Sequence, residues 1–269
     1  MGKNHNSKFL AFLFILILSL IWRGRLLFLS GIWWDDWAWL WHYFASSTFS
    51  EFISPFQNFG HELGGSIFFM NFKLLDLMPS IMATNIWRGI HFLSITANAL
   101  LLYLITARIY RRDKLLPMAI SMFYLVSPVV NNFCLSVQQN ELLLTSFLIS
   151  LIFTIKSLTN EKYRVRYYLL ALIFSAFSML GLESFILFET SRLFIISWVL
   201  KRRDIRKYCW KDFKNAVFKW LPFLLISISL AVYKLSVPLQ GAYKGVYKFA
   251  NLTSLKAFFG IFFRFGLSL

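Results

Sequence analysis

The chain has 269 residues, of which 58% are hydrophobic and only 15% are charged, and phenylalanine alone contributes 31. A soluble domain of this size would carry far more charge, so the composition excludes an ordinary soluble protein and indicates a polytopic membrane protein. The net charge of +16 would suggest nucleic-acid binding in a soluble protein. Here the basic residues fall in short segments between apolar runs, as in the cytoplasmic loops of membrane proteins. We therefore expect membrane lipids as partners and no nucleic acid.

The apolar runs predict an all-α fold, a polytopic transmembrane helical bundle. Most runs have about 15–24 residues, enough to cross roughly 30 Å of hydrocarbon, and they lack the ~10-residue alternation of membrane barrels. We predict about eight spans. They cover residues 9–32, 86–107, 115–133, 141–155, 167–181, 183–200, 220–236 and 256–269. All belong to one domain, 1–269, which we expect to be C-terminally incomplete because its last run covers only ~21 Å.

The N-terminus is short, polar and basic, so we place it in the cytoplasm. No small-x-small cleavage site follows the first run, which favours a signal anchor over a cleaved signal peptide. Counting turns from there puts every strongly basic segment, above all 201–219, on the cytoplasmic side. We expect a multi-pass protein of the plasma or inner membrane whose first large loop lies outside. Cys134 and Cys209 then lie on opposite sides, and no disulfide is expected.

A long aromatic and amphipathic segment, 33–84, forms this outer loop. It carries turn signals at Ser54-Pro55 and Gly64-Gly65. We expect short helices lying in the membrane interface, one of them over 67–78, where a re-entrant element is the alternative. A second, short outer turn is predicted at 136–140.

Two adjacent carboxylates, Asp35 and Asp36, lie among five tryptophans at the start of the outer loop. An aromatic belt at the membrane surface explains the tryptophans but does not need two acids beside lipid phosphates. We favour a functional pair that faces a cavity over acids that only mark the boundary with water. The pair could hold one hard cation, Mg²⁺ or Mn²⁺, with a substrate phosphate, although two oxygen ligands do not specify a metal.

Basic residues mark the ends of the first two spans. Arg23 and Arg25 either extend to the lipid headgroups or bind a lipid-linked phosphate, to which guanidinium binds in a bidentate manner. Arg88 and His91 share a helix face, and Asn98 lies on roughly the same stripe. This stripe predicts either the lining of a cavity or a hydrogen-bonded seam between helices.

Acidic and amide side chains give further candidates. Gln139 and Glu141 lie in an amide-rich stretch that is ordinary for a turn but also fits a surface for hydroxyl-rich ligands. Glu183 begins the sixth span and could be only a helix-start acid. Glu189 lies ~9 Å into an apolar helix, where Arg192 could neutralise it as a structural ion pair.

His61 and Glu62 are secondary candidates in the outer loop. No two histidines have the spacing of metal ligands, so a zinc site is not supported. The sequence has no G-x-S-x-G, no P-loop and no glycine-rich dinucleotide loop, which disfavours ATP-driven transport and hydrolase chemistry.

In order and spacing over about residues 9–200, the chain resembles the GT-C superfamily of integral-membrane glycosyltransferases. The likeness is to users of polyprenyl-phosphate sugars, such as the protein O-mannosyltransferase-like and the lipid-A- or O-antigen-modifying branches. Five features carry it. They are the acidic pair Asp35-Asp36, the second span at 85–91 and 99–104, the turn Ser127-Pro128, the start of the fourth span at 141–144, and Leu182-Glu183 at the family's "KE" step. The chain departs from the family in having Leu182 for the lysine and no "RP" motif after the acidic pair.

The resemblance implies a sugar donor on a dolichyl- or undecaprenyl-type phosphate and a hydroxyl acceptor on a glycan, lipid or protein. Asp35 or Asp36 would be the general base, and Arg23, Arg25 or Arg88 would stabilise the leaving phosphate. His91 and Glu183 would help to bind the substrates. The departures are also compatible with an inactive relative. The alternative is a non-catalytic membrane protein, such as a transporter or a flippase of lipid-linked glycans, although no two similar halves are visible.

Overall fold

The computed structural model describes residues 3–27, 35–57, 61–110, 113, 115–127, 135–181, 184–203 and 210–236. Within these residues the regular structure consists of ten α-helices and one 3₁₀ turn, which confirms the all-α prediction. Three described segments are long and apolar enough to cross a membrane: Ser80–Ile109, Gln138–Thr159 and Asp212–Tyr233. Two shorter apolar helices cover Phe9–Arg23 and Leu115–Val126. These helices indicate a membrane protein, while the bundle of about eight spans stays a prediction.

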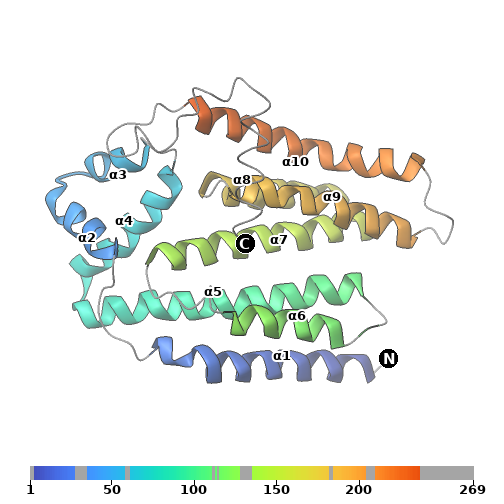
Figure 1. Ribbon diagram of the computed structural model, residues 1–269, viewed down its shortest axis with the longest axis horizontal. Helices are drawn as coiled ribbons and strands as arrows, with labels where there is room; N and C mark the ends of the chain where they lie inside the picture. The colour runs from blue at the N-terminus through green and yellow to red at the C-terminus, as the bar shows by residue number, and fades with distance from the viewer. Residues whose placement is uncertain are drawn as a thin grey trace.

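The helices of the bundle lie roughly parallel to one another and alternate in direction along the chain (Figure 1). They are α1 (Lys3–Arg23), α5 (Ser80–Ile109), α6 (Leu115–Val126), α7 (Leu135–Thr159), α8 (Arg164–Gly181), α9 (Ser184–Arg203) and α10 (Trp210–Ser236). Three short helices, α2 (Asp35–Ala45), α3 (Phe49–Gln57) and α4 (Glu62–Leu77), gather at the end where α1 stops and α5 begins (Figure 1). We call this the α2–α4 end of the bundle.

Basic residues gather at the opposite end of the bundle. Helix α5 ends near Arg108, α8 begins at Arg164, and α9 ends at Arg203. All three helix ends point away from α2–α4 (Figure 1). This arrangement agrees with the predicted alternation of loops, whereas the orientation across the membrane remains a prediction.

Two predicted boundaries are wrong. The first span was expected as one helix over 9–32, but α1 ends at Arg23 and a 3₁₀ turn, Gly24–Leu27, follows. The turn predicted at 136–140 lies inside α7, because Gln138 and Gln139 are buried against other helices instead of facing water. The last predicted span, 256–269, and both cysteines lie outside the described residues.

The segment predicted as the outer loop folds into short helices over its described residues, as predicted. The expected helix over 67–78 falls within α4, which begins at Glu62. An aromatic and aliphatic cluster joins α2, α3 and α4 to the start of α5. Its buried members are Leu40, Tyr43, Phe52, Phe56, Phe68, Phe72, Ala83 and Trp87. The Trp87 indole also donates a hydrogen bond to the carbonyl oxygen of Asn71 at 3.0 Å, so α5 packs with α2, α3 and α4 as one unit.

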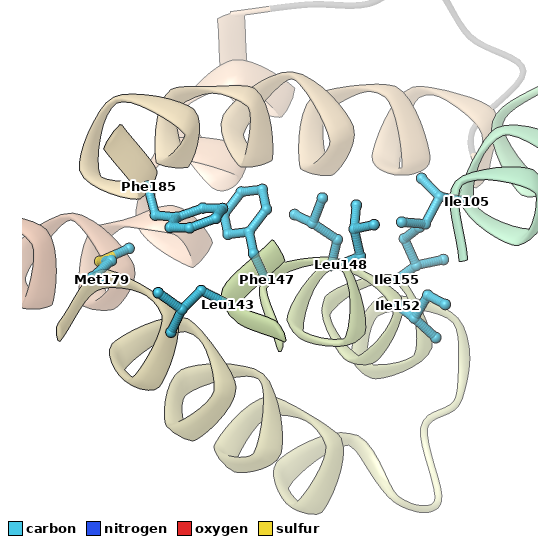
Figure 2. Packing of buried hydrophobic residues seen from close by; sticks show 9 residues of the cluster. Ile105, Leu143, Phe147, Leu148, Ile152, Ile155, Met179 and Phe185 are labelled. Carbon is cyan, nitrogen blue, oxygen red and sulfur yellow. The ribbon is translucent and has the colours of Figure 1, made fainter. Parts of the chain in front are cut away.

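The largest described apolar core surrounds α7. Leu143, Phe147 and Leu151 recur at spacings of four residues along one face of this helix and are buried. Figure 2 shows the Phe147 ring beside the Phe185 ring of α9, and their centroids are 5.5 Å apart. Helix α7 therefore has protein neighbours on several sides. It contributes some of the polar side chains described next.

Candidate functional site

An interior polar cluster, defined here as Arg23, His91, Asn98, Tyr124 and Glu141, joins four helices. The Asn98 side-chain nitrogen lies 2.7 Å from Glu141 Oε2 and 3.1 Å from the Tyr124 hydroxyl. The same hydroxyl donates a hydrogen bond to Glu141 Oε2. Arg23 lies within electrostatic range of His91, Tyr124 and Glu141. The polar stripe predicted on the second span is thus in part a hydrogen-bonded seam between helices.

Helix geometry explains why these side chains meet. His91 and Asn98 are seven residues apart, which is close to two helical turns, so they lie on one face of α5. Asn98 is fully buried and His91 is 3% exposed. This face of α5 packs against α6 and α7, which supply Tyr124 and Glu141. Tyr124 was not predicted as a site residue, because a tyrosine in an apolar helix looks the same in sequence as one that faces lipid.

Arg23 turns inward instead of reaching the headgroups. It is 1% exposed, and its Nε and Nη2 atoms donate to the carbonyl oxygens of Leu125 and Ser127 at 2.9 and 2.7 Å. These carbonyls lie at the end of α6, where backbone oxygens lack helical partners and carry partial negative charge. Arg23 therefore caps α6, and the expectation that it extends to the lipid surface is wrong. The Arg25 side chain lies outside the described residues.

Asp36 is buried, with 3% of its surface exposed. It shares one face of α2 with Leu40 and Tyr43, at spacings of four and three residues, and both are members of the aromatic cluster. The reading of this acid as a mere marker of the water boundary requires exposure, which Asp36 does not have. The side chain of Asp35 lies outside the described residues.

Arg88 and His91 lie near the α2–α4 end of the bundle. Arg88 is 6% exposed and follows Trp87, which packs in the same cluster as Leu40 of α2. His91 Nε2 is buried and has no hydrogen-bond partner among the described residues. Both side-chain polar atoms of Gln138 are likewise buried and unbonded in the described part of the chain. Because such atoms cost free energy when unsatisfied, water or a ligand is their expected partner.

The secondary candidates His61 and Glu62 hold helices together. A ring nitrogen of His61, Nδ1, lies 3.3 Å from the carbonyl oxygen of Gly181, and Glu62 Oε1 accepts a 2.5 Å hydrogen bond from the Tyr233 hydroxyl. Gln139 packs directly on Gly64, where an added Cβ would lie 2.1 Å from the Gln139 side-chain nitrogen. These contacts attach the start of α4 to α7, α8 and α10.

Glu189 forms the buried ion pair with Arg192 that the sequence offered as its structural alternative. The guanidinium also donates to Thr154 and Ser150, and lies over the Phe223 ring at 4.0 Å from the centroid. Glu189 Oε2 accepts from Ser175 at 3.1 Å. The partners of this pair among the described residues lie between helices in the bundle interior, which favours a packing role. Glu183 lies outside the described residues.

Tyr43 connects α2 to α4 outside the candidate spans. Its hydroxyl donates to Asp76 Oδ2 at 2.6 Å, and Lys73 Nζ donates to the same oxygen at 2.7 Å. The two donors, Lys73 first, hold the pKa of the Asp76 carboxyl below its ordinary value. Burial, with the bond to Asp76, raises the pKa of the Tyr43 hydroxyl.

Among the residues the structure describes, no three histidine, cysteine, aspartate or glutamate side chains gather as a metal site. No family model, curated protein or solved structure matches the chain.

Proposed function

We propose that this protein is a membrane glycosyltransferase that moves a sugar from a polyprenyl-phosphate donor to a hydroxyl acceptor at the outer or lumenal face. The observation that carries the proposal is the burial of Asp36 on the face of α2 that packs toward the bundle. Aspartates are rarely buried, and a buried acid at the end of a bundle of apolar helices is a candidate for chemistry. The resemblance of the surrounding sequence to the acidic pair of GT-C enzymes supports this assignment.

In the proposed reaction, the Asp36 carboxylate takes the proton of the acceptor hydroxyl as its oxygen attacks the anomeric carbon. The new carbon–oxygen bond forms while the bond from the anomeric carbon to the donor phosphate oxygen breaks. The electron pair leaves with the lipid phosphate, and the proton stays on the carboxylate. General-base assistance of this type contributes roughly 10²–10⁴-fold to a rate.

The leaving phosphate needs a positive charge beside it. We assign this role first to Arg88, because it follows Trp87 in the cluster that holds α2, whereas Arg23 caps the end of α6. In a water-poor setting, a fixed guanidinium stabilises developing negative charge more strongly than it does in water. Arg25 and Glu183 keep their proposed roles in substrate binding. His91 lies three residues beyond Arg88 and is proposed to contact the substrate from the same helix face.

The test compares Asp36→Asn and Asp35→Asn with the parent protein in proteoliposomes. Transfer of radiolabelled hexose from a panel of polyprenyl-phosphate hexoses to added glycan, lipid and peptide acceptors is measured, with and without a chelator of Mg²⁺ and Mn²⁺. Asp36→Asn is expected to lose activity by about 10²-fold or more, and Asp35→Asn shows whether the neighbouring acid is also required. Glu161→Gln is the matched control, since this acid is 67% exposed near the basic end.

Full activity of Asp36→Asn would overturn the assignment of Asp36 as the base, and full activity of both aspartate variants would overturn the glycosyltransferase proposal. The alternative is a transporter or a flippase. It would be favoured if adding lipid-linked sugar changed which parts of the protein can be reached from each side of the membrane while the parent formed no transferred product.

A further inference from the structure

Helix α2 has a buried face and a separate exposed face. Trp37, Trp41 and Phe44 lie at spacings of four and three residues, which puts them on one stripe of the helix. They are 59%, 78% and 64% exposed, respectively. Three large aromatic side chains grouped on one exposed stripe are a feature of interaction surfaces more than of surfaces that face only water.

Contacts with α3 and α4 fix the orientation of α2 and therefore the side on which the stripe lies. The Trp39 ring packs on Phe56 with a centroid distance of 4.2 Å, and His42 Nε2 lies 3.2 Å from the carbonyl oxygen of Phe52. The bond between Tyr43 and Asp76 adds a connection to α4. Rotation of α2 to bury the stripe would break these contacts, so the aromatic rings stay on the outside.

The neighbouring exposed side chains indicate what covers the stripe. At the same end of the bundle, the junction of α4 and α5 exposes Leu77, Ile81 and Met82 by 72%, 68% and 55% (Figure 1). Tryptophan rings, which carry a polar N–H group, thus lie beside aliphatic side chains at the end of an apolar helix. A lipid leaflet has the same sequence of layers, with polar headgroups next to hydrocarbon. Indoles favour the headgroup region, and aliphatic groups favour the hydrocarbon below it.

We propose that the stripe of Trp37, Trp41 and Phe44 docks in the headgroup region of a lipid bilayer, so that α2 lies in the membrane interface. Helices of this kind bind with their apolar face ~5–10 Å below the headgroup boundary. The docking fixes the depth of Asp36, which is turned toward the protein on the same helix. The proposal concerns a lipid-binding surface and does not depend on the glycosyltransferase activity.

The test places a fluorophore on the stripe. Trp41→Cys is combined with Cys134→Ser and Cys209→Ser, labelled with an environment-sensitive nitrobenzoxadiazole dye, and reconstituted into phosphatidylcholine–phosphatidylglycerol vesicles. Lipids with a nitroxide near the headgroup are expected to quench the dye several-fold more than lipids with a nitroxide at the chain end. Aqueous iodide is expected to quench it weakly. Trp37→Cys and Phe44→Cys repeat the measurement on the same stripe.

Leu93→Cys provides the matched control, because Leu93 is 64% exposed within the candidate span α5. Its dye is expected to be quenched more by the deep nitroxide, which shows that the reconstituted protein is inserted and folded. With that control in place, strong quenching of the stripe dye by iodide without quenching by the lipid nitroxides would overturn the proposal, because the stripe would then face water. Protection of the dye from both kinds of quencher would also overturn the proposal, because the stripe would then be covered by a protein partner.

Discussion

Asn98 and Glu141 meet inside the bundle although 43 residues separate them in the sequence. The Asn98 side-chain nitrogen lies 2.7 Å from the Glu141 carboxylate and 3.0 Å from the carbonyl oxygen of the same residue. One amide therefore contacts both the side chain and the backbone of α7. Because both residues are buried, this contact contributes to the alignment of α5 and α7.

Replacing Asn98 by alanine removes the donor and leaves the buried Glu141 carboxylate with fewer partners. We expect a loss of about 1–3 kcal/mol in the free energy of unfolding, measured by equilibrium denaturation in mixed micelles. Asn98→Asp is expected to cost more, since it places a second acid beside Glu141. Tyr124→Phe removes one donor to Glu141 and one acceptor of Asn98, leaves the contact between Asn98 and Glu141 in place, and serves as the comparison. Equal stability of Asn98→Ala and the parent would contradict a structural role for the contact.

The Glu189–Arg192 pair makes a different prediction, because both members carry charge. Glu189→Gln leaves the fully buried Arg192 without its counter-charge, and we expect a loss of about 3–5 kcal/mol in unfolding free energy. Adding Arg192→Met should recover part of that loss, which a double-mutant cycle measures. The exposed pair Lys73–Asp76 is the control, with an expected coupling of about 0–1 kcal/mol. A double variant less stable than Glu189→Gln alone would argue against mutual neutralisation.

The helices could be predicted from the sequence because apolar length is a local property, but two of their boundaries could not. Helix α1 ends at Arg23. The side chain of Arg23 donates hydrogen bonds to carbonyl oxygens of residues more than a hundred positions further along the chain. The stretch 136–140 looked like a turn because amides are typical of turns, yet it is helical where Gln138 and Gln139 are buried by neighbouring helices. Both outcomes depend on long-range contacts that composition does not record.

The candidate site was predictable to a similar extent. The spacing of His91 and Asn98 indicated one polar face of a helix, and the spacing of Glu189 and Arg192 indicated an ion pair. The partner of Asn98 across the bundle was not predictable, since it requires knowing which helices are neighbours.

Glycine packing gives a matched pair of variants. An added Cβ at Gly65 would lie 2.4 Å from Phe56 Cγ and 2.8 Å from Phe56 Cβ, whereas at Gly89 nothing lies within 4 Å. We expect Gly65→Ala to lower the unfolding free energy by about 1–3 kcal/mol through overpacking between α3 and α4. Gly89→Ala, in the middle of α5, should be neutral or stabilising by up to ~1 kcal/mol, because alanine is the better helix former. Thermal denaturation of both variants in the same detergent tests this, and an equal loss would contradict the packing of Phe56 on Gly65.

The bond between Tyr43 and Asp76 predicts a pH dependence. The pKa of Asp76 is lowered in the folded protein, so the folded state binds its proton less readily than the unfolded state. The resulting stabilisation is present above the unfolded value of about 4 and is lost as the pH falls through the lower folded pKa. Tyr43→Phe removes one of the two donors and should bring the pKa of Asp76 closer to its ordinary value.

We therefore expect the gap in unfolding free energy between the parent and Tyr43→Phe to narrow as the pH is lowered below about 4. Denaturation curves at a series of pH values measure this gap. Tyr168→Phe is the control, because its hydroxyl donates at 2.8 Å to the backbone carbonyl of Lys219, which does not titrate, so its gap should stay constant. A gap for Tyr43→Phe that is just as constant would mean that the hydroxyl does not stabilise the ionised carboxylate, and that α2 is held on α4 by aromatic packing alone.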